Sequence, residues 1–484
     1  MRTVVPRMST AAWLLLAACS GGVAPAGEPA AAFFSPGLVH EVSICLDPDD
    51  WERLRRSSRP YPYFPADLTI DGHRLPWVGL RKKGTAGSLS DTRPALKVRL
   101  DRYARGRRFL GLRRLTLNNA LQDGARLRQC LAYRLYRRAG VPAPRCNFAR
   151  VTVNGRDLGI YANVETIDEV FLARLYPGPA VLYEGNYTDL DAGWRSRVER
   201  KTPATGPGEV LDRLVGALYL PEGDLLPALA RLLDLEEFFR FWALTVLMAN
   251  TDSFHSNGGN FYLAYEEAAG RFHFIPWGAD EGFSPPSPGS GLLWVAGPLL
   301  VKRLLALPAG RARYLDTLRD MLAKVWRERQ LLGWIDEVAG KLAAGLFPAA
   351  RAGFREQLEV VRGFLRDRRR NLLEEMAPAR TRPPPGSLLA ERPLAYFAPF
   401  RTGSAQTVCT RLYWGGPGPL SGRAFSREAA LAVRLEEGAG GPRLCVTLRA
   451  PARPGRHLVL VRPRGQRRAL SPLQVVTLPE PRWE

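Results

Sequence analysis

The segment from Ala249 to Gly282, ANTDSFHSNGGNFYLAYEEAAGRFHFIPWGADEG, combines a polar loop, a hairpin pattern and an acidic turn. Its two apolar runs, Asn260 to Tyr265 and Arg271 to Ile275, flank Ala269 and Gly270, as is typical of two strands joined by a turn. A hairpin returns the chain to its starting point, so the acidic turn is predicted to lie beside the polar loop. We therefore expect side chains from both ends of this segment to share one site.

A long apolar run precedes the segment. From Leu235 to Met248, apolar residues including Phe238, Phe241 and Trp242 occur on every side of a helical projection. A helix that is apolar all round is buried, whereas a surface helix carries a polar face. We therefore predict a buried helix that holds the following polar loop rigidly.

The polar loop and the acidic turn carry side chains that suit phosphoryl transfer. This reaction uses one carboxylate to accept or orient a hydroxyl proton, and an amide with a second carboxylate to hold magnesium against the phosphates. Asp252 is the candidate for the first role as catalytic base, and Asn260 and Asp280 are candidates for the metal-binding role. Asn257 and Glu281 are less favoured metal ligands. The alternative for Asp252 is that it only caps a turn through its own backbone.

Lysines in the N-terminal half are candidates for binding phosphates. In the predicted strand Ala95 to Leu100 the apolar residues face one way and Lys97 the other, so a cation projects from a buried strand. The chain has only seven lysines among 69 basic residues, and Lys82, Lys83 and Lys97 are three of them. A lysine ammonium is a compact charge, whereas arginine is a planar fork. We expect Lys97 and Lys83 to contact phosphates; the alternative is that these lysines are solubilising charges at strand edges.

Three stretches of the N-terminal half carry further motifs in a fixed order. They are GLRKKGTAGS from Gly79 to Ser88, RPALKVRLDR from Arg93 to Arg102, and LTLNNALQDGARLRQCLAYRLYRRAGVPAPRCNFARVTVNGRDLGIYANVETID from Leu115 to Asp168. Together with the hairpin segment, they resemble the CotH kinase family, named after spore coat protein H, over roughly Pro36 to Phe283. Members of that family are secreted or surface-attached atypical protein kinases.

The resemblance implies an α+β fold of the atypical protein-kinase type, with two lobes. It implies ATP and Mg²⁺, or Mn²⁺, as cofactors, and transfer of the γ-phosphate to Ser or Thr hydroxyls of exported proteins. It favours Asp252 as catalytic base, because Asp252 lies in the matched loop. It favours Asn260 as a metal ligand, because the family's aromatic Phe-Tyr-Leu follows it. Gln129 and Glu165 are expected at the nucleotide site, with Glu165 where a kinase has its hinge. Glu184 is a further candidate for the nucleotide cleft. The alternative is that Glu165 and Glu184 each only end a strand.

Two positions depart from the family pattern. The family usually carries Pro-Trp-Asp-x-Asp, but Gly278 stands at the first Asp. Asp280 or Glu281 can substitute, because an oxygen-only magnesium site depends on carboxylate placement more than on sequence offset. Gln129 stands where relatives often have a glutamate that pairs with the strand lysine. These departures favour a second function, a degenerate pseudokinase fold that acts in cell-surface binding, adhesion or envelope structure.

The N-terminus has the features of a lipoprotein signal. Arg2 and Arg7 precede a short apolar run, and the lipobox Leu-Ala-Ala-Cys ends at Cys19. We predict a signal peptide over residues 1–18 and a lipidated Cys19 that anchors the exported chain to a membrane, with residues 19–35 as a flexible tether. Ser20 favours the outer membrane if the cell has one. The alternative is a plain cleaved signal peptide with a chance cysteine.

The remaining chain divides into two predicted regions. A kinase-like domain is expected over residues 36–378, with an N-terminal lobe to about 165 and a largely helical C-terminal lobe from about 166. Consecutive prolines mark a linker over residues 379–387. Short alternating strands over residues 388–484 predict a small β-sandwich-like domain.

Five cysteines remain when Cys19 is set aside. An exported location permits disulfides, and Cys409 with Cys445 can close a loop in the C-terminal region. An odd count means that at least one thiol is free or pairs outside the chain.

The formal net charge of +22 raises the question of nucleic-acid binding. The basic residues are spread along the chain, and no zinc-finger or RNP-type pattern occurs. Five scattered histidines form no zinc-type ligand cluster in the sequence. We therefore expect neither nucleic acid nor zinc as a partner, and the charge instead suits anionic envelope polymers or an acidic substrate.

Overall fold

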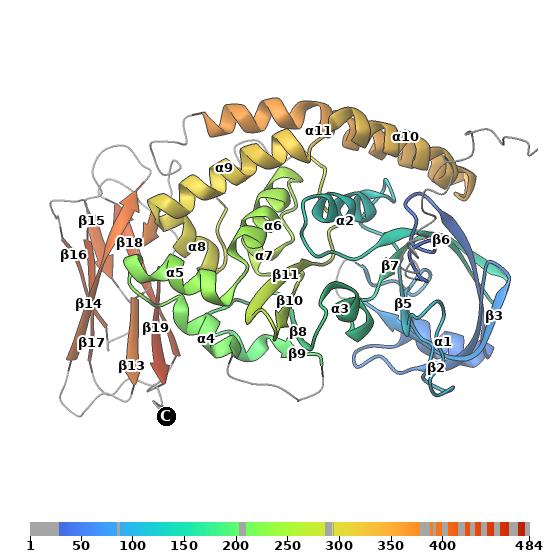
Figure 1. Cartoon of the computed structure of the whole chain (residues 1–484), viewed down its shortest axis with the longest axis horizontal. Helices are drawn as coiled ribbons and strands as arrows, with labels where there is room; N and C mark the ends of the chain where they lie inside the picture. The colour runs from blue at the N-terminus through green and yellow to red at the C-terminus, as the bar shows by residue number, and fades with distance from the viewer. Residues whose placement is uncertain are drawn as a thin grey trace, which may run out of the picture.

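The computed structural model describes residues 29–377, apart from 85–87, 203–209, 286–292 and 294, and eight strand segments between Leu388 and Pro479. The predicted signal peptide, Cys19, most of the predicted tether and the predicted linker lie outside the described residues. Helices and sheets both occur, which confirms the predicted α+β class. Figure 1 shows a barrel at one end, a helical region in the middle and the C-terminal strands at the other end.

The N-terminal half is a closed β-barrel with the order β1-β2-β3-β4-β5-β7-β6. Its strands are β1 (Val39–Cys45), β2 (Phe64–Ile70), β3 (His73–Lys83), β4 (Ala95–Arg99), β5 (Arg114–Asn118), β6 (Cys146–Val153) and β7 (Arg156–Glu165). Side chains of β2 alternate between buried and partly buried, as expected for a strand with one face toward a core. Closure depends on the parallel pairing of β1 with β6, in which Val39 lies opposite Phe148. The local sequence patterns predict strands in this region, but not this long-range pairing.

Two helices flank the barrel, α1 (Pro48–Arg56) and α2 (Arg128–Arg138). Asp47 caps α1 by accepting hydrogen bonds from the backbone of its first turn. A disulfide between Cys130 and Cys146 joins α2 to β6. Cys45 is exposed and free.

The middle of the molecule holds a second sheet, in the order β11-β10-β8-β9. Its strands are β8 (Ala180–Gly185), β9 (Glu199–Arg200), β10 (Phe261–Glu266) and β11 (Arg271–Pro276). The strands β10 and β11 form the predicted hairpin, with Phe261 opposite Pro276. The helix α3 (Glu169–Leu175) lies next to this sheet, between it and the barrel (Figure 1).

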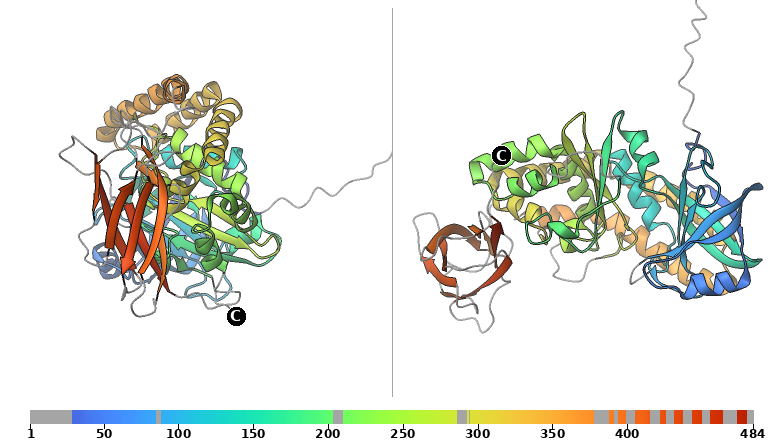
Figure 2. Two further views of the ribbon diagram at one scale, coloured as in Figure 1. Left: turned by 90° about the vertical axis from the view of Figure 1, so that its left-hand side faces the viewer. Right: turned by 90° about the horizontal axis from the view of Figure 1, so that it is seen from below.

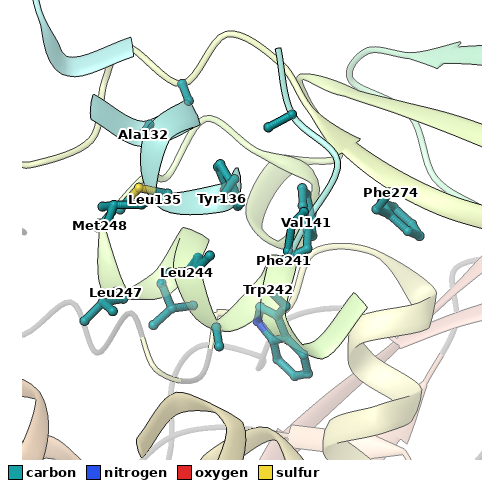
Figure 3. Close-up of a cluster of buried hydrophobic side chains, with 14 of the residues drawn as sticks. Ala132, Leu135, Tyr136, Val141, Phe241, Trp242, Leu244, Leu247, Met248 and Phe274 are labelled. Carbon is teal, nitrogen blue, oxygen red and sulfur yellow. The ribbon is translucent and has the colours of Figure 1, made fainter. Parts of the chain in front are cut away.

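Helices surround the second sheet. They are α4 (Val210–Ala217), α5 (Glu222–Leu232), α6 (Leu235–Leu247), α7 (Phe254–Asn257), α8 (Leu299–Ala306), α9 (Pro308–Lys324), α10 (Glu328–Ala344) and α11 (Arg351–Met376). The helix α6 is almost wholly buried, as its all-round apolar sequence predicts. In Figure 3, Phe241 and Leu244 of α6 lie among Leu135 and Tyr136 of α2 and Phe274 of β11.

One hydrophobic core joins the barrel to the helical region. It contains Phe148 and Ile160 from barrel strands together with Trp242 of α6 and Leu365 of α11. The helices α10 and α11 run along both regions in Figure 1. Gln357 of α11 accepts a hydrogen bond from the Arg128 side chain at 3.0 Å. The shared core therefore fixes the barrel relative to the β10–β11 hairpin.

The C-terminal strands form two four-stranded sheets, with the orders β12-β14-β17-β16 and β13-β19-β18-β15. They are β12 (Leu388–Ala390), β13 (Leu394–Ala398), β14 (Ala405–Trp414), β15 (Gly422–Phe425), β16 (Leu431–Glu436), β17 (Arg443–Arg449), β18 (Gly455–Pro463) and β19 (Leu473–Pro479). Figure 2 shows the two sheets facing each other. Cys409 lies opposite Cys445 in the register of β14 and β17, and Cys445 is disulfide-bonded.

Among the helices of the described residues, none has both the length and the apolar character needed to cross a membrane.

Candidate active site

A cavity of about 840 Å³ lies between the barrel and the β10–β11 hairpin. Strands β3 and β4 supply one wall, and the segments before and after the hairpin supply the other. Six residues selected from the sequence line it, namely Lys83, Lys97, Gln129, Asp252, Asn260 and Asp280. The structure therefore brings together groups that are up to 197 residues apart in the chain, from Lys83 to Asp280.

Asp252 is held by two asparagines of its own loop. Asn257 Nδ2 donates to Asp252 Oδ1 at 2.8 Å, and Asn260 Nδ2 donates to Asp252 Oδ2 at 2.6 Å. Asn257 is exposed and is not among the cavity-lining residues, so it orients Asp252 instead of facing a metal. Since the Asn260 amide nitrogen is engaged, its oxygen is the atom left to ligate a metal.

The loop and the acidic turn are tied together by the backbone. Trp277 N donates to the carbonyl of Asn260 at 3.1 Å, and Phe283 N donates to the carbonyl of Met248 at 2.7 Å. Arg368 of α11 also donates to the last carbonyls of α6, including Leu247 O at 3.0 Å. These bonds hold the turn containing Asp280 against the end of α6, beside Asp252.

Gly278 has a backbone conformation that suits glycine. Its φ is +54°, and a Cβ there would lie 2.7 Å from Asn260 Oδ1. A side chain at this position would therefore strain the backbone and displace Asn260. The observed position of the Asn260 amide therefore requires a glycine at residue 278. An Asp at this position, as in the family pattern, would collide with Asn260.

Asp280 is a buried carboxyl group without a complete set of countercharges. Burial raises its pKa to about 7, and the neighbouring Asp123 adds to the shift while Lys83 opposes it. The neighbouring Glu281 is exposed and accepts a hydrogen bond from Gln122 Nε2 at 2.8 Å. Glu281 is not among the lining residues, so Asp280 is the carboxylate that this turn directs into the cavity.

The barrel wall of the cavity is cationic. Arg81 and Lys97 are cross-strand partners, and Lys83 lies on the same face of β3. Burial lowers the pKa of Lys83 to about 8, and burial together with Arg81 lowers the pKa of Lys97 to about 8. Lys82 has the opposite orientation, and its Nζ donates to Asp91 Oδ1 at 2.8 Å. The alternation of β3 therefore separates a structural lysine from a cavity lysine.

Gln129 lies at the cavity as a neutral, fixed group. Its Oε1 accepts from Asn118 Nδ2 at 2.8 Å, and its Nε2 donates to the Tyr133 hydroxyl at 3.1 Å. It makes no ion pair with a strand lysine, because an amide carries no charge. Gln129 can therefore present only a hydrogen-bonding amide to a ligand.

Glu165 is not among the residues that line the cavity, so the prediction of a nucleotide contact is wrong for this structure. It is 2% exposed and forms ion pairs with Arg145 at 2.7 Å and with Arg174 at 2.8 Å. These two guanidinium groups satisfy the carboxylate within the protein. Glu165 therefore joins the end of β7 to its neighbours, which matches the alternative reading that it only ends a strand.

The cavity also includes Glu184, which the sequence offers as a cleft residue or a strand end, and further residues that the sequence patterns missed. Glu184 lines the cavity and is paired with Lys201 at 2.7 Å. Tyr187 also lines it, and burial together with the nearby Asp252 carboxylate raises the pKa of its hydroxyl. Arg59, Arg81, Arg197 and Lys201 add positive charge. The pairing of β8 with β10 places Glu184 opposite Tyr262, a contact that no local motif predicts.

Comparison with known proteins gives a consistent assignment. The model of the family described as CotH kinase protein matches residues 80–372. Inner spore coat protein H of Bacillus subtilis is 26% identical over 186 residues, which cover 36% of this chain and half of that relative. The inner spore coat protein H-like protein of Bacillus subtilis is 26% identical over 269 residues, covering 53% of this chain and 81% of that relative.

One solved kinase structure aligns with a large part of the chain. The proinflammatory kinase CtkA of Helicobacter pylori aligns with 64% of this chain and 93% of its own, at 9% identity and a TM-score of 0.25. A score this low establishes no shared fold. The family assignment depends on the sequence match, which covers more than half of the 484 residues. The chain belongs to the CotH family.

Proposed function

We propose that the protein is a divalent-cation- and ATP-dependent protein kinase that transfers the γ-phosphate of ATP to Ser or Thr hydroxyls of exported proteins. The observation that carries this proposal is the shared cavity, in which Asp252, Asn260 and Asp280 lie across from Lys83 and Lys97. Family membership supports the same chemistry.

The charges of the cavity fit a metal–nucleotide complex. Lys83 and Lys97 have lowered pKa values because burial removes water from their ammonium groups, so a phosphate would supply the missing anion. Asp280 has a raised pKa because burial disfavours its carboxylate, so a cation would supply the missing positive charge. A nucleotide with a bound divalent cation meets both requirements at once.

Each residue then has a defined task. Asp252, oriented by Asn257 and Asn260, accepts or orients the proton of the acceptor hydroxyl. Asn260 and Asp280 would hold Mg²⁺ or Mn²⁺, which neutralises charge on the phosphates when bound. Lys83 and Lys97 bind phosphate oxygens and orient the phosphate chain.

The cellular location belongs to the proposal as well. We propose that the chain is exported and held at a membrane by a lipid on Cys19, at the outer membrane in a cell that has one, where its substrates are other exported proteins. The sequence features that support this are the lipobox and the short apolar run before it. The spread of basic residues supports a protein substrate and not a nucleic acid.

Two observations favour a second candidate function, a catalytically degenerate fold used for binding, adhesion or envelope structure. Gly278 cannot contribute a carboxylate, and a side chain there would meet Asn260. Gln129 cannot form an ion pair with a lysine of the barrel wall. A degenerate protein would retain the cavity and bind a nucleotide without transferring its phosphate.

Autophosphorylation with labelled ATP separates the two functions. We expect incorporation by the wild-type protein, and a decrease of about 10²- to 10⁴-fold in Asp252→Ala, the range typical of a lost general base. The control is Asp224→Asn, which removes an exposed carboxylate in the first turn of α5. Wild-type incorporation no higher than that of Asp252→Ala, with nucleotide binding retained, would exclude the kinase and support the degenerate fold.

A further inference from the structure

A second cluster of ionisable side chains lies away from the cavity, at the outer edge of the second sheet. One possible ligand atom from each of Asp234, Glu237 and His273 lies within 4.8 Å of the other two. Asp234 and Glu237 belong to the start of α6, and His273 belongs to the edge strand β11. Glu266, at the end of β10, approaches the same imidazole, with its Oε2 3.4 Å from His273 Nε2.

Glu237 and His273 of the cluster are buried, whereas Asp234 is partly exposed. Glu237 is 5% exposed and His273 is 8% exposed. His273 Nδ1 lies 3.1 Å from Glu237 Oε2, and His273 Nε2 faces Glu266 Oε2 at 3.4 Å. Glu237 Oε1 has no hydrogen-bond partner in the described part of the protein. Buried polar atoms without partners are uncommon, because each one loses its hydrogen bonds to water. Glu237 Oε1 is therefore an atom that a bound cation would satisfy.

The charges in the cluster are also unbalanced. Three carboxyl groups, those of Asp234, Glu237 and Glu266, surround one imidazole. Burial raises the pKa of the Glu237 carboxyl group, although the positive charge of Arg240 acts to lower it. A single imidazolium cannot neutralise three carboxylates, whereas a divalent cation with a neutral imidazole ligand comes closer.

The surrounding structure orients the side chains in advance. Asp234 caps α6 by accepting from Glu237 N at 2.9 Å, and its own backbone N donates to Phe272 O at 2.9 Å. The ring of Tyr176 lies 5.0 Å from the ring of His273. Phe274 of β11 packs against Phe241 of α6 (Figure 3). The start of α6 and the edge of β11 are thus already fixed to each other before any ion binds.

We propose that Asp234, Glu237 and His273 form a structural site for a divalent transition metal, with Glu266 beside the imidazole Nε2 as an orienting carboxylate. One imidazole nitrogen with carboxylate oxygens is a ligand set that suits Zn²⁺. The scattered histidines of the sequence predict no zinc, but this site needs only one histidine, and the fold supplies two carboxylates from the start of α6. The ion would join α6 to the hairpin that carries Asn260 at its start and leads to Asp280.

Zinc binding by the metal-stripped full chain tests the proposal, and it does not depend on kinase activity. With Zn²⁺ as the only added metal, we expect the wild-type protein to retain one ion per chain and to melt at a higher temperature. His273→Asn and Glu237→Gln should weaken zinc binding by about tenfold or more. Glu267→Gln is the matched control, because Glu267 is an exposed carboxylate of the same hairpin.

Binding of zinc in the cavity must be separated from binding at this cluster. Asp280→Asn should leave the retained zinc unchanged if the ion lies at His273, and should remove it if the ion lies in the cavity. If His273→Asn fails to fold, X-ray absorption of the zinc-loaded wild-type protein decides the question, since the site predicts a single imidazole among oxygen ligands. Absence of retained zinc, loss of zinc in Asp280→Asn, or a spectrum without imidazole would each overturn the proposal.

Discussion

The two walls of the cavity carry opposite charge and come from different halves of the chain. The barrel wall presents Arg81, Lys83 and Lys97, whereas the hairpin wall presents Asp252 and Asp280 with the neutral Asn260. Burial shifts the pKa of the lysines downward and that of Asp280 upward, so on each wall it disfavours the charged form. The comparison indicates that each wall needs a ligand of opposite charge. Only the assembled fold brings the two walls close enough to bind a single ligand that carries both charges.

The strongest test removes the buried carboxylate of the hairpin wall. We expect Asp280→Asn to lower kcat by about 10²- to 10³-fold and to raise the Mg²⁺ concentration needed for half-maximal activity. Steady-state kinetics over a Mg²⁺ series measures both effects. The control is Glu281→Gln, because Glu281 is exposed in the same turn and is not among the lining residues. Equal losses in the two variants would contradict the assignment of Asp280 as the metal ligand.

Removing a cation from the barrel wall should have the next largest effect. Lys97→Met should weaken ATP binding by about 10- to 150-fold, which corresponds to the loss of one charged hydrogen bond. Calorimetry with ATP measures this change. Lys82→Met should instead lower the melting temperature with little change in ATP affinity, because Lys82 pairs with Asp91 away from the cavity. An equal decrease in ATP affinity in both variants would show that the two faces of β3 do not differ in function.

A smaller change tests the contact between Gly278 and Asn260. Gly278→Ala places a methyl group 2.7 Å from Asn260 Oδ1 on a backbone with φ of +54°. We expect a loss of about 1–2 kcal/mol in the free energy of unfolding. We also expect a higher Mg²⁺ concentration for half-maximal activity, because Asn260 would move. Chemical denaturation and Mg²⁺ titration check the two parts. Unchanged stability with unchanged Mg²⁺ dependence would mean that Asn260 can move without consequence.

The smallest expected effect concerns the pH dependence of stability without nucleotide or metal. The pKa of Asp280 is raised from 3.8 to about 7 in the folded protein. A raised pKa contributes stability that is complete below the unfolded value and is lost as pH rises through about 7. Asp280→Asn has no charge to lose, so its melting temperature relative to the wild type should be higher near pH 8 than near pH 5. A constant difference would contradict the raised pKa.

Much of the site follows from local patterns in the chain. The hairpin returns Asp280 to the neighbourhood of Asp252, as the two apolar runs and the turn at Gly270 predict. The strand alternation around Lys97 also predicts its orientation, because successive side chains of a strand point to opposite faces. These relationships depend on residues that are close in sequence.

Other features depend on contacts between distant segments. Glu165 is predicted at the nucleotide site, but it pairs with Arg145 and Arg174 away from the cavity. Tyr187 reaches Asp252 from an irregular segment that has no repeating pattern. The pairing of Cys130 with Cys146 was one of several that an odd number of cysteines allows. Local sequence patterns do not show which distant residue will contact Glu165, Tyr187 or Cys130.

The sequence by itself determined the α+β class, the buried helix α6, the hairpin after it and the ordered motifs of the CotH family, because each of these depends on short-range periodicity or residue order. Tertiary structure decided the closure of the barrel, the shared core that fixes the two walls of the cavity, and the meeting of His273 with the start of α6. The physical reason is that strand register and burial between distant segments depend on the packing of the whole chain, so that charge balance at a site exists only after folding.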